Sequence, residues 1–185
     1  MVSAKRLARY IIFAIKERMT DISPEEFDIT PLKLQKLLYY CQGYSLALTG
    51  KPAFPDPIEA WQYGPVVDSV YQDYKQYSGG IIPYGSISRE DLSDEPLEEV
   101  VKLVIYDKVR YSGETLARAT HQESPWRETF AGPYTNIQIS NTKMRKYFSN
   151  KFSKREEEDG DTDEAWDSLG ETVSVSELEA ALEEI

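Results

Sequence analysis

The sequence predicts a mainly α-helical chain with a small β element (α+β): about six to seven helices, a short strand pair and an acidic C-terminal tail. Apolar residues recur at helical spacing in segments that start at capping residues. A short apolar run beside prolines is typical of a strand. The net charge of −11 lies in residues 153–185, with 13 acidic and 2 basic side chains, whereas residues 1–152 hold 19 of each. We therefore expect a domain at 1–152 and a tail at 153–185.

The helices are predicted from apolar stripes and from the residues that begin and end them. The predicted segments are 3–18, 31–49, 65–77, 93–110, 114–121, 125–130 and 141–152. The expected N-caps are Ser3, Thr30, Ser93, Ser112, Ser124 and Ser140, because a hydroxyl can accept from a free N–H of the first turn. In the second helix, Tyr39 and Tyr40 cannot both share the stripe that contains Leu34 and Leu38. That helix is expected to be covered on two sides.

The β element is predicted around the stretch EAWQYGPVV at residues 59–67. Residues 57–61 read as a strand, and the extended run 81–88 is its expected partner. Gly64 allows backbone angles closed to other residues, and Pro65 suits the first turn of a helix. The stretch is therefore interpreted as a strand-to-helix corner that packs on the second helix or presents Trp61 and Tyr63 to a partner.

The acidic tail is predicted to have two parts. Residues 153–170 are charged and poor in large apolar side chains, which indicates a disordered linker. Ser174 and Glu177 form a capping box, and an amphipathic helix is expected at about 174–184. Its apolar stripe consists of Val175, Leu178, Ala181, Leu182 and Ile185. This short helix is expected to fold on a partner or to dock back on the domain.

Composition argues against several classes of protein. No run approaches the roughly 20 apolar residues of a membrane span, and no cleavable signal peptide is expected. Cys41 is the single cysteine, so an internal disulfide is excluded and a reducing, cytoplasmic setting is expected. A neutral domain with an anionic tail makes nucleic acid an unlikely ligand, because phosphate binding needs clustered cations.

Candidate chemistry in the sequence is sparse. His121, the single histidine, lies near Glu123 and Ser124, which allows a cryptic hydrolase. The alternative interpretation is that Ser124 caps a helix and His121 closes the preceding one. The acidic run DGDTDE departs from a calcium loop because its glycine, Gly160, is misplaced. No metal, cofactor or phosphate-binding loop is expected.

Three motifs together resemble a known family. The helix motif LQKLLYY, the corner EAWQYGPVV and the segment THQESPW occur in the order found in the Panacea domain, the SocA-like antitoxin domain of bacteria and their phages. The resemblance covers roughly residues 3–150, and the tail lies outside it. The signature residues that the resemblance implies are Gln35, Tyr39, Tyr40, Gly64, Pro65, His121 and Pro125.

The resemblance implies a non-enzymatic protein that binds and neutralises a toxin, typically one encoded by an adjacent gene. It also implies that some members deliver a partner to a protease. The residues expected to bind the partner are Trp61, Tyr63, Tyr71, Tyr74 and Trp126 in the domain, and Trp166, Leu178 and Leu182 in the tail. The cryptic hydrolase, and a phage or host regulatory protein without a toxin partner, are the alternative hypotheses.

Overall fold

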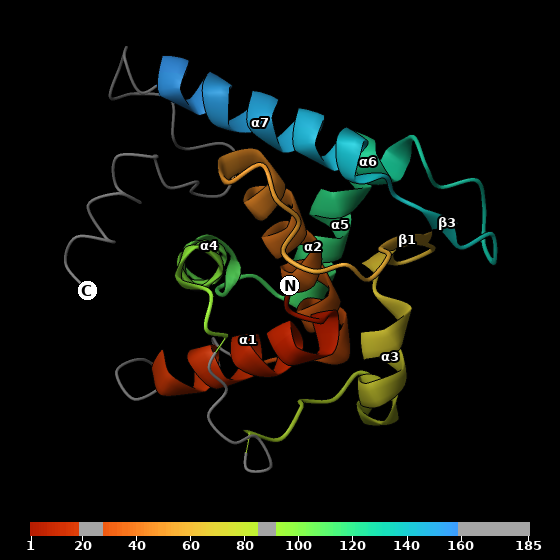
Figure 1. The fold of residues 1–185 in the computed structure, drawn as a ribbon. Helices are drawn as coiled ribbons and strands as arrows, with labels where there is room; N and C mark the ends of the chain where they lie inside the picture. Colours follow the sequence, from red (N-terminus) through yellow and green to blue (C-terminus); the bar gives the residue numbers. More distant parts are fainter. Residues whose placement is uncertain (19–27, 85–91, 159–185) are drawn as a thin grey trace.

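The computed structural model describes residues 1–18, 28–84 and 92–158, and its helices surround one central helix (Figure 1). The described elements are α1 (Ala4–Arg18), α2 (Pro31–Leu48), β1 (Glu59–Trp61), β2 (Gly64–Val66), α3 (Asp68–Tyr74), the 3-10 helix η2 (Lys75–Tyr77), α4 (Glu95–Lys108), α5 (Gly113–Gln122), α6 (Ser124–Arg127), β3 (Ile137–Gln138) and α7 (Asn141–Glu158). The fold is therefore mainly helical with a small sheet, as predicted.

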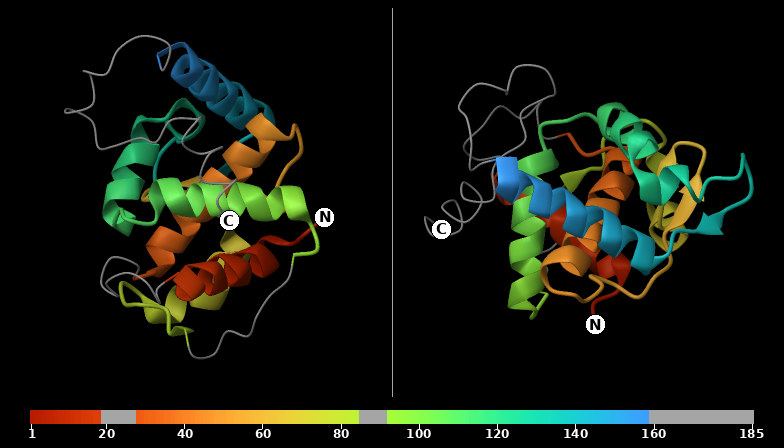
Figure 2. Two further views of the ribbon diagram at one scale, coloured as in Figure 1. Left: turned by 90° about the vertical axis from the view of Figure 1, so that its left-hand side faces the viewer. Right: turned by 90° about the horizontal axis from the view of Figure 1, so that it is seen from above.

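The central helix is α2, which contacts α1, α3, α4, α5, α7 and the β2 strand. Fifteen of its 18 residues are buried, so it is covered on every side rather than on two. The hydroxyl of Thr30 accepts a hydrogen bond from the Lys33 N–H at 3.2 Å and caps the helix as expected. Seen from above, α7 crosses over α2 (Figure 2).

An aromatic cluster joins α2 to α7. The ring of Phe148 makes edge-to-face contacts with Tyr39, Tyr40 and Tyr44, at centroid distances of 5.5, 6.1 and 5.7 Å. This close approach depends on Gly43, where an added Cβ would lie 2.1 Å from a ring carbon of Phe148. The signature tyrosines of the LQKLLYY motif therefore belong to the core.

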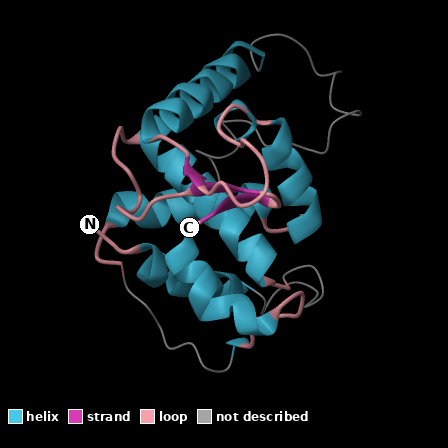
Figure 3. Cartoon of the chain, turned by 90° about the vertical axis from the view of Figure 1, so that its right-hand side faces the viewer, coloured by secondary structure: helices cyan, strands magenta, loops and turns pink. Residues whose placement is uncertain are grey.

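The stretch EAWQYGPVV forms a β-hairpin, so the predicted strand-to-helix corner is wrong. β1 and β2 are antiparallel, with Trp61 opposite Gly64 and Ala60 opposite Pro65, and α3 begins only at Asp68. Pro65 is tolerated because β2 is an edge strand, where its missing N–H breaks no ladder bond. The strand order is β2-β1-β3, and the three short strands lie together on one face of the molecule (Figure 3).

The partner strand of β1 also differs from the prediction. β3 lies between the predicted helices 125–130 and 141–152, where no strand was predicted, and it pairs with Glu59 and Ala60. Within the described residues 81–84 there is no strand, and the Ile82 N–H instead donates to the carbonyl of Ile29 at 2.8 Å. Residues 85–88 of the predicted partner lie outside the described residues. A two-residue strand is too short to show an alternating pattern, which explains the error.

Most of the predicted helix starts are confirmed. The hydroxyls of Ser3, Thr30, Ser112 and Ser140 each accept a hydrogen bond from a backbone N–H three residues later. Two caps are wrong by one residue: the carboxylate of Asp94 caps α4 in place of Ser93, and Glu123 occupies the N-cap position of α6 in place of Ser124. Aspartate caps as well as serine, so sequence alone does not separate Ser93 from Asp94. The side chain of Glu123 makes no capping hydrogen bond, so it carries no capping signal.

The last described helix is longer than predicted. α7 continues to Glu158, so helix replaces the first six residues of the segment predicted to be a disordered linker. The remaining linker and the predicted helix at about 174–184 lie outside the described residues. The division into a domain and an acidic tail stays a prediction.

Replacing Gly43 with alanine tests the contact between α2 and α7. We expect Gly43→Ala to lower the free energy of unfolding by about 1–3 kcal/mol, because overpacking forces the Phe148 ring to move. This loss should exceed the gain of roughly 1 kcal/mol that alanine brings to a helix. Urea unfolding followed by circular dichroism measures the effect. Gly79→Ala is the control, since an added Cβ there meets nothing within 4 Å, and equal stability of the two variants would contradict the packing argument.

Candidate functional site

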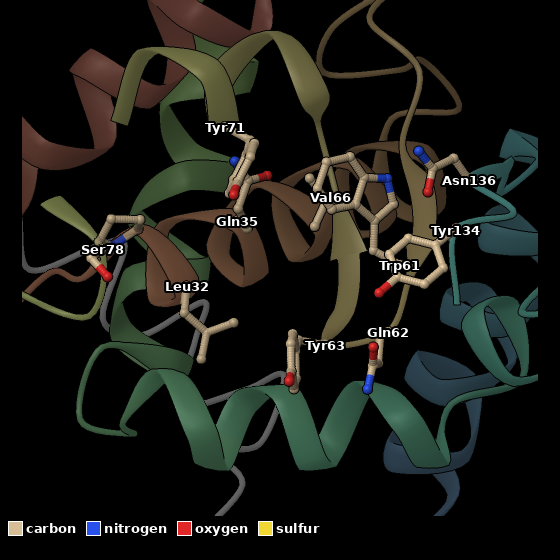
Figure 4. Close-up of a pocket in the computed structure, with 11 residues that line it drawn as sticks. Leu32, Gln35, Trp61, Gln62, Tyr63, Val66, Tyr71, Ser78, Tyr134 and Asn136 are labelled. Atoms are coloured by element: carbon tan, nitrogen blue, oxygen red, sulfur yellow. The ribbon is translucent and has the colours of Figure 1, made fainter. Parts of the chain in front are cut away.

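A groove lies beside the hairpin and has a cavity volume of about 570 Å³. We call it the aromatic groove. It is lined by Pro31, Leu32, Gln35, Trp61, Gln62, Tyr63, Val66, Tyr71, Ser78, Tyr134 and Asn136. Figure 4 shows these side chains arriving from α2, the hairpin, α3 and the loop before β3. Three of the predicted partner-binding residues, Trp61, Tyr63 and Tyr71, therefore lie together.

The hairpin wall of the groove is attached to α2 by polar side chains. The Gln35 amide accepts from the Val67 N–H at 2.8 Å and donates to the Val67 carbonyl at 3.4 Å. The buried Lys36 ammonium donates to the Pro65 carbonyl at 2.9 Å. Beside it, Gly64 has φ of +96°, and an added Cβ would lie 2.8 Å from the Lys36 Nζ. The signature residues Gln35, Gly64 and Pro65 thus hold the hairpin in place.

Trp61 forms the floor of the aromatic groove. Its ring meets Tyr71 edge to face at a centroid distance of 5.1 Å, and its indole N–H donates to the Glu59 carboxylate at 2.7 Å. Its backbone carbonyl accepts from the Trp126 indole at 2.9 Å. The half-buried Trp61 is therefore fixed in orientation, with part of its surface open to the groove.

Two tyrosines on the groove are largely exposed to solvent. Tyr63, at the hairpin turn, is 69% exposed, and Tyr134 is 95% exposed. Tyr134 and Asn136 have positive φ values of 70° and 46°, so the loop between α6 and β3 turns sharply there. Tyr134, Asn136 and Leu32 line the groove but were not predicted from the sequence. The stretch GPYTN at residues 132–136 is rich in turn-forming residues, which indicates a loop. This local signal does not indicate that the loop contacts a hairpin some 70 residues earlier in the chain.

Two further predicted partner-binding residues, Tyr74 and Trp126, do not line the groove. Tyr74 is half-buried and packs on Tyr77 at a centroid distance of 6.5 Å. Trp126 is 8% exposed and stacks between the rings of His121 and Phe130. Trp166, Leu178 and Leu182 lie outside the described residues. The binding roles of these five residues stay predictions.

His121 and Glu123 have separate surroundings. The His121 ring stacks on Trp126 at 4.1 Å, and burial together with the Lys36 charge lowers the pKa of His121. Glu123 accepts from the Tyr40 hydroxyl at 3.4 Å and pairs with Lys151 at 3.5 Å. Burial raises the pKa of Glu123, although the neighbouring ammonium groups oppose this shift. Among the described residues no hydrogen bond joins His121 to Glu123 or Ser124, so the hydrolase arrangement is not assembled in this structure.

The described part of the chain lacks the features of a membrane span and of a clustered metal site. Among the described helices, none has the length and apolarity that a membrane crossing requires. Within the same ranges, potential metal ligands do not gather in groups of three or more. Pro125 is buried at the start of α6.

Comparison with known proteins identifies the family of this chain. A family model described as antitoxin SocA-like, Panacea domain, matches residues 34–127. The chain belongs to this family. A protein named Antitoxin SocA from Caulobacter vibrioides is 28% identical over 138 residues, which cover 69% of this chain and 73% of that protein. The search of solved structures found no match. The matched region runs from α2 to α6 and contains most of the groove.

Lys36 gives the domain a pH dependence that can be measured. Burial lowers the pKa of Lys36 from 10.5 to about 7. Between these values the unfolded chain holds a proton that the folded chain has partly released, so the free energy of unfolding rises with pH. Relative to Lys36→Met, we expect the wild type to gain at most about 1.4 kcal/mol per pH unit between roughly pH 7.5 and 9.5.

Urea unfolding of both proteins at several pH values measures this difference. The buried Lys33 titrates in both proteins and cancels in the difference. His121 is coupled to Lys36, but its pKa is lowered from 6.5, so it is neutral in both proteins above about pH 7.5 and the difference reports on Lys36. If the free energies of unfolding of the wild type and of Lys36→Met change in parallel with pH, then Lys36 stays protonated beneath the hairpin and the prediction is wrong.

Proposed function

We propose that this chain is an antitoxin that binds a protein toxin through the aromatic groove and thereby neutralises it. The observation that carries the proposal is the pair of exposed tyrosines, Tyr63 and Tyr134, beside the fixed rings of Trp61 and Tyr71. Membership of the SocA-like antitoxin family supports the same role. The toxin is expected to be the product of an adjacent gene, acting with this chain in the cytoplasm.

The groove has the composition of a protein-binding surface. Tyrosine and tryptophan bury a large area with few rotatable bonds, so they lose little conformational entropy on binding. Polar groups of Gln62 and Asn136 lie beside the rings and can satisfy hydrogen bonds of a partner backbone. Because Trp61 is already hydrogen-bonded and packed, the surface is largely preorganised.

The acidic tail extends the proposal to the charge of the partner. Residues 153–185 carry 13 acidic and 2 basic side chains, which favours a toxin with a cationic surface. Charges at the edge of an interface mainly increase the association rate, whereas aromatic anchors carry most of the binding energy. Neutralisation then proceeds by blocking the toxin directly or by delivering it to a protease.

Alanine variants of the exposed tyrosines test the groove. We expect Tyr63→Ala and Tyr134→Ala each to weaken binding to the adjacent gene product by roughly 10- to 100-fold, the range of an interface anchor. Both side chains are exposed, so the free energy of unfolding should change little. Co-expression, pulldown and titration calorimetry measure binding, and a growth test measures neutralisation.

Tyr106→Ala is the matched control, because Tyr106 is also exposed but lies on α4, away from the groove. Equal losses in all three variants, or none, would reject the groove as the binding surface. The amount of toxin in rescued cells separates the two mechanisms. Direct blocking leaves the toxin at a constant level, whereas protease delivery lowers it until the protease is removed.

A further inference from the structure

A second surface lies on α7 and is formed by lysines. Ser124, Glu128, Lys143, Lys146, Tyr147, Asn150, Lys151 and Lys154 line a hollow with a volume of about 440 Å³. We call it the lysine cleft. The α7 members are spaced three or four residues apart, so they lie along one side of the helix. This stripe runs beside the buried face made by Met144, Phe148 and Phe152. The cations therefore project from a helix that the core holds in place.

The positive charge of the lysine cleft is only partly neutralised. Lys151 pairs with the buried Glu123 at 3.5 Å, and Lys143 donates to the Glu128 backbone carbonyl at 3.4 Å. Within the described ranges, neither Lys146 nor Lys154 forms an ion pair. The cleft thus has four lysines against two glutamates, Glu123 and Glu128. The ammonium groups of Lys146 and Lys154 favour an anionic occupant.

The chain itself carries a segment of the complementary charge. Residues 159–185 contain 10 acidic side chains and no basic one, and they directly follow the last turn of α7. Lys143 and Lys154 are about 16 Å apart along the helix, at 1.5 Å per residue. By random-coil statistics, about 15 residues span roughly 20 Å, a distance sufficient to reach back along α7. A tethered segment also has an effective concentration of about a millimolar or more at a nearby site.

We propose that the lysine cleft binds residues 159–185 of the same chain, so that the acidic segment covers one side of α7. Charge complementarity and the short tether carry the inference, and it does not depend on the aromatic groove. The contact is electrostatic and exposed, so it weakens as salt screens the charges. A basic protein surface that attracts the acidic segment would compete with the cleft and release it.

Paramagnetic labelling of the full-length chain tests this contact. A nitroxide on Ser174→Cys reports on nearby backbone amides by NMR, and the native Cys41 is buried and should not react. We expect loss of peak intensity for amides of residues 143–154 but not for those of α1 and α3. The loss should disappear at about 1 M salt, where the Debye length is roughly 3 Å.

Charge-reversed variants show whether the lysines carry the contact. In the labelled chain, Lys146→Glu with Lys154→Glu should restore the intensity of the α7 amides. The control Lys16→Glu with Lys75→Glu changes the net charge equally, but at exposed sites on α1 and η2, and should leave the loss unchanged. Unshifted core amides confirm that both variants are folded.

Two results would overturn the proposal. Either the α7 amides keep full intensity in the wild type, or both double variants behave alike. In the first case, titration with a short acidic peptide and with single-stranded RNA would identify an external anion as the occupant of the cleft. Because no toxin is present in these experiments, their failure is distinct from failure of the proposed antitoxin function.

Discussion

The structure depends on the burial of α2, whose polar side chains must find partners inside the protein. Gln35 closes a pair of hydrogen bonds on the backbone of Val67, and Gln42 does the same on Phe54 at 3.2 and 3.3 Å. Lys36 binds the carbonyl at the centre of β2. Unpaired buried polar groups are costly, so each of these contacts fixes a segment that has little hydrophobic core of its own. The hairpin and the proline-rich connector are consequently held against the helix at defined points.

This arrangement explains how a sheet of very short strands supports a binding surface. Strands of two or three residues are marginal by themselves. Here β1 and β2 rest on α2 through the contacts of Gln35 and Lys36, and β3 is added along the other edge of β1. The rigidity of the aromatic groove therefore comes from the helix beneath it. Tyr63 and Tyr134 can remain exposed because neither is needed to stabilise the fold.

The sequence predicted those features of the fold that depend on neighbouring residues, such as helices and their caps. Helical stripes and four hydroxyl caps predicted most helices. Of the residues predicted to bind a partner, the structure brings Trp61, Tyr63 and Tyr71 together at the aromatic groove, and their binding role stays a prediction. The hairpin was missed because Pro65 at a turn reads as the first residue of a helix, whereas the positive φ of Gly64 is set by contacts with distant residues on α2 and α5. Tyr134 was missed for the same reason: its place on the groove follows from the pairing of β3 with β1.

One stretch of chain takes part in both surfaces. Glu128 lines the lysine cleft, Tyr134 and Asn136 line the aromatic groove, and α7 then returns to the cleft. At the start of this stretch, the Trp126 indole donates to the Trp61 carbonyl and so ties α6 to the floor of the groove. In the proposed binding mode, Trp126 would act by positioning Trp61. The loop that carries Tyr134 and Asn136 continues directly into α7. A partner that shifts this loop at the aromatic groove would therefore also pull on the start of the helix that lines the lysine cleft.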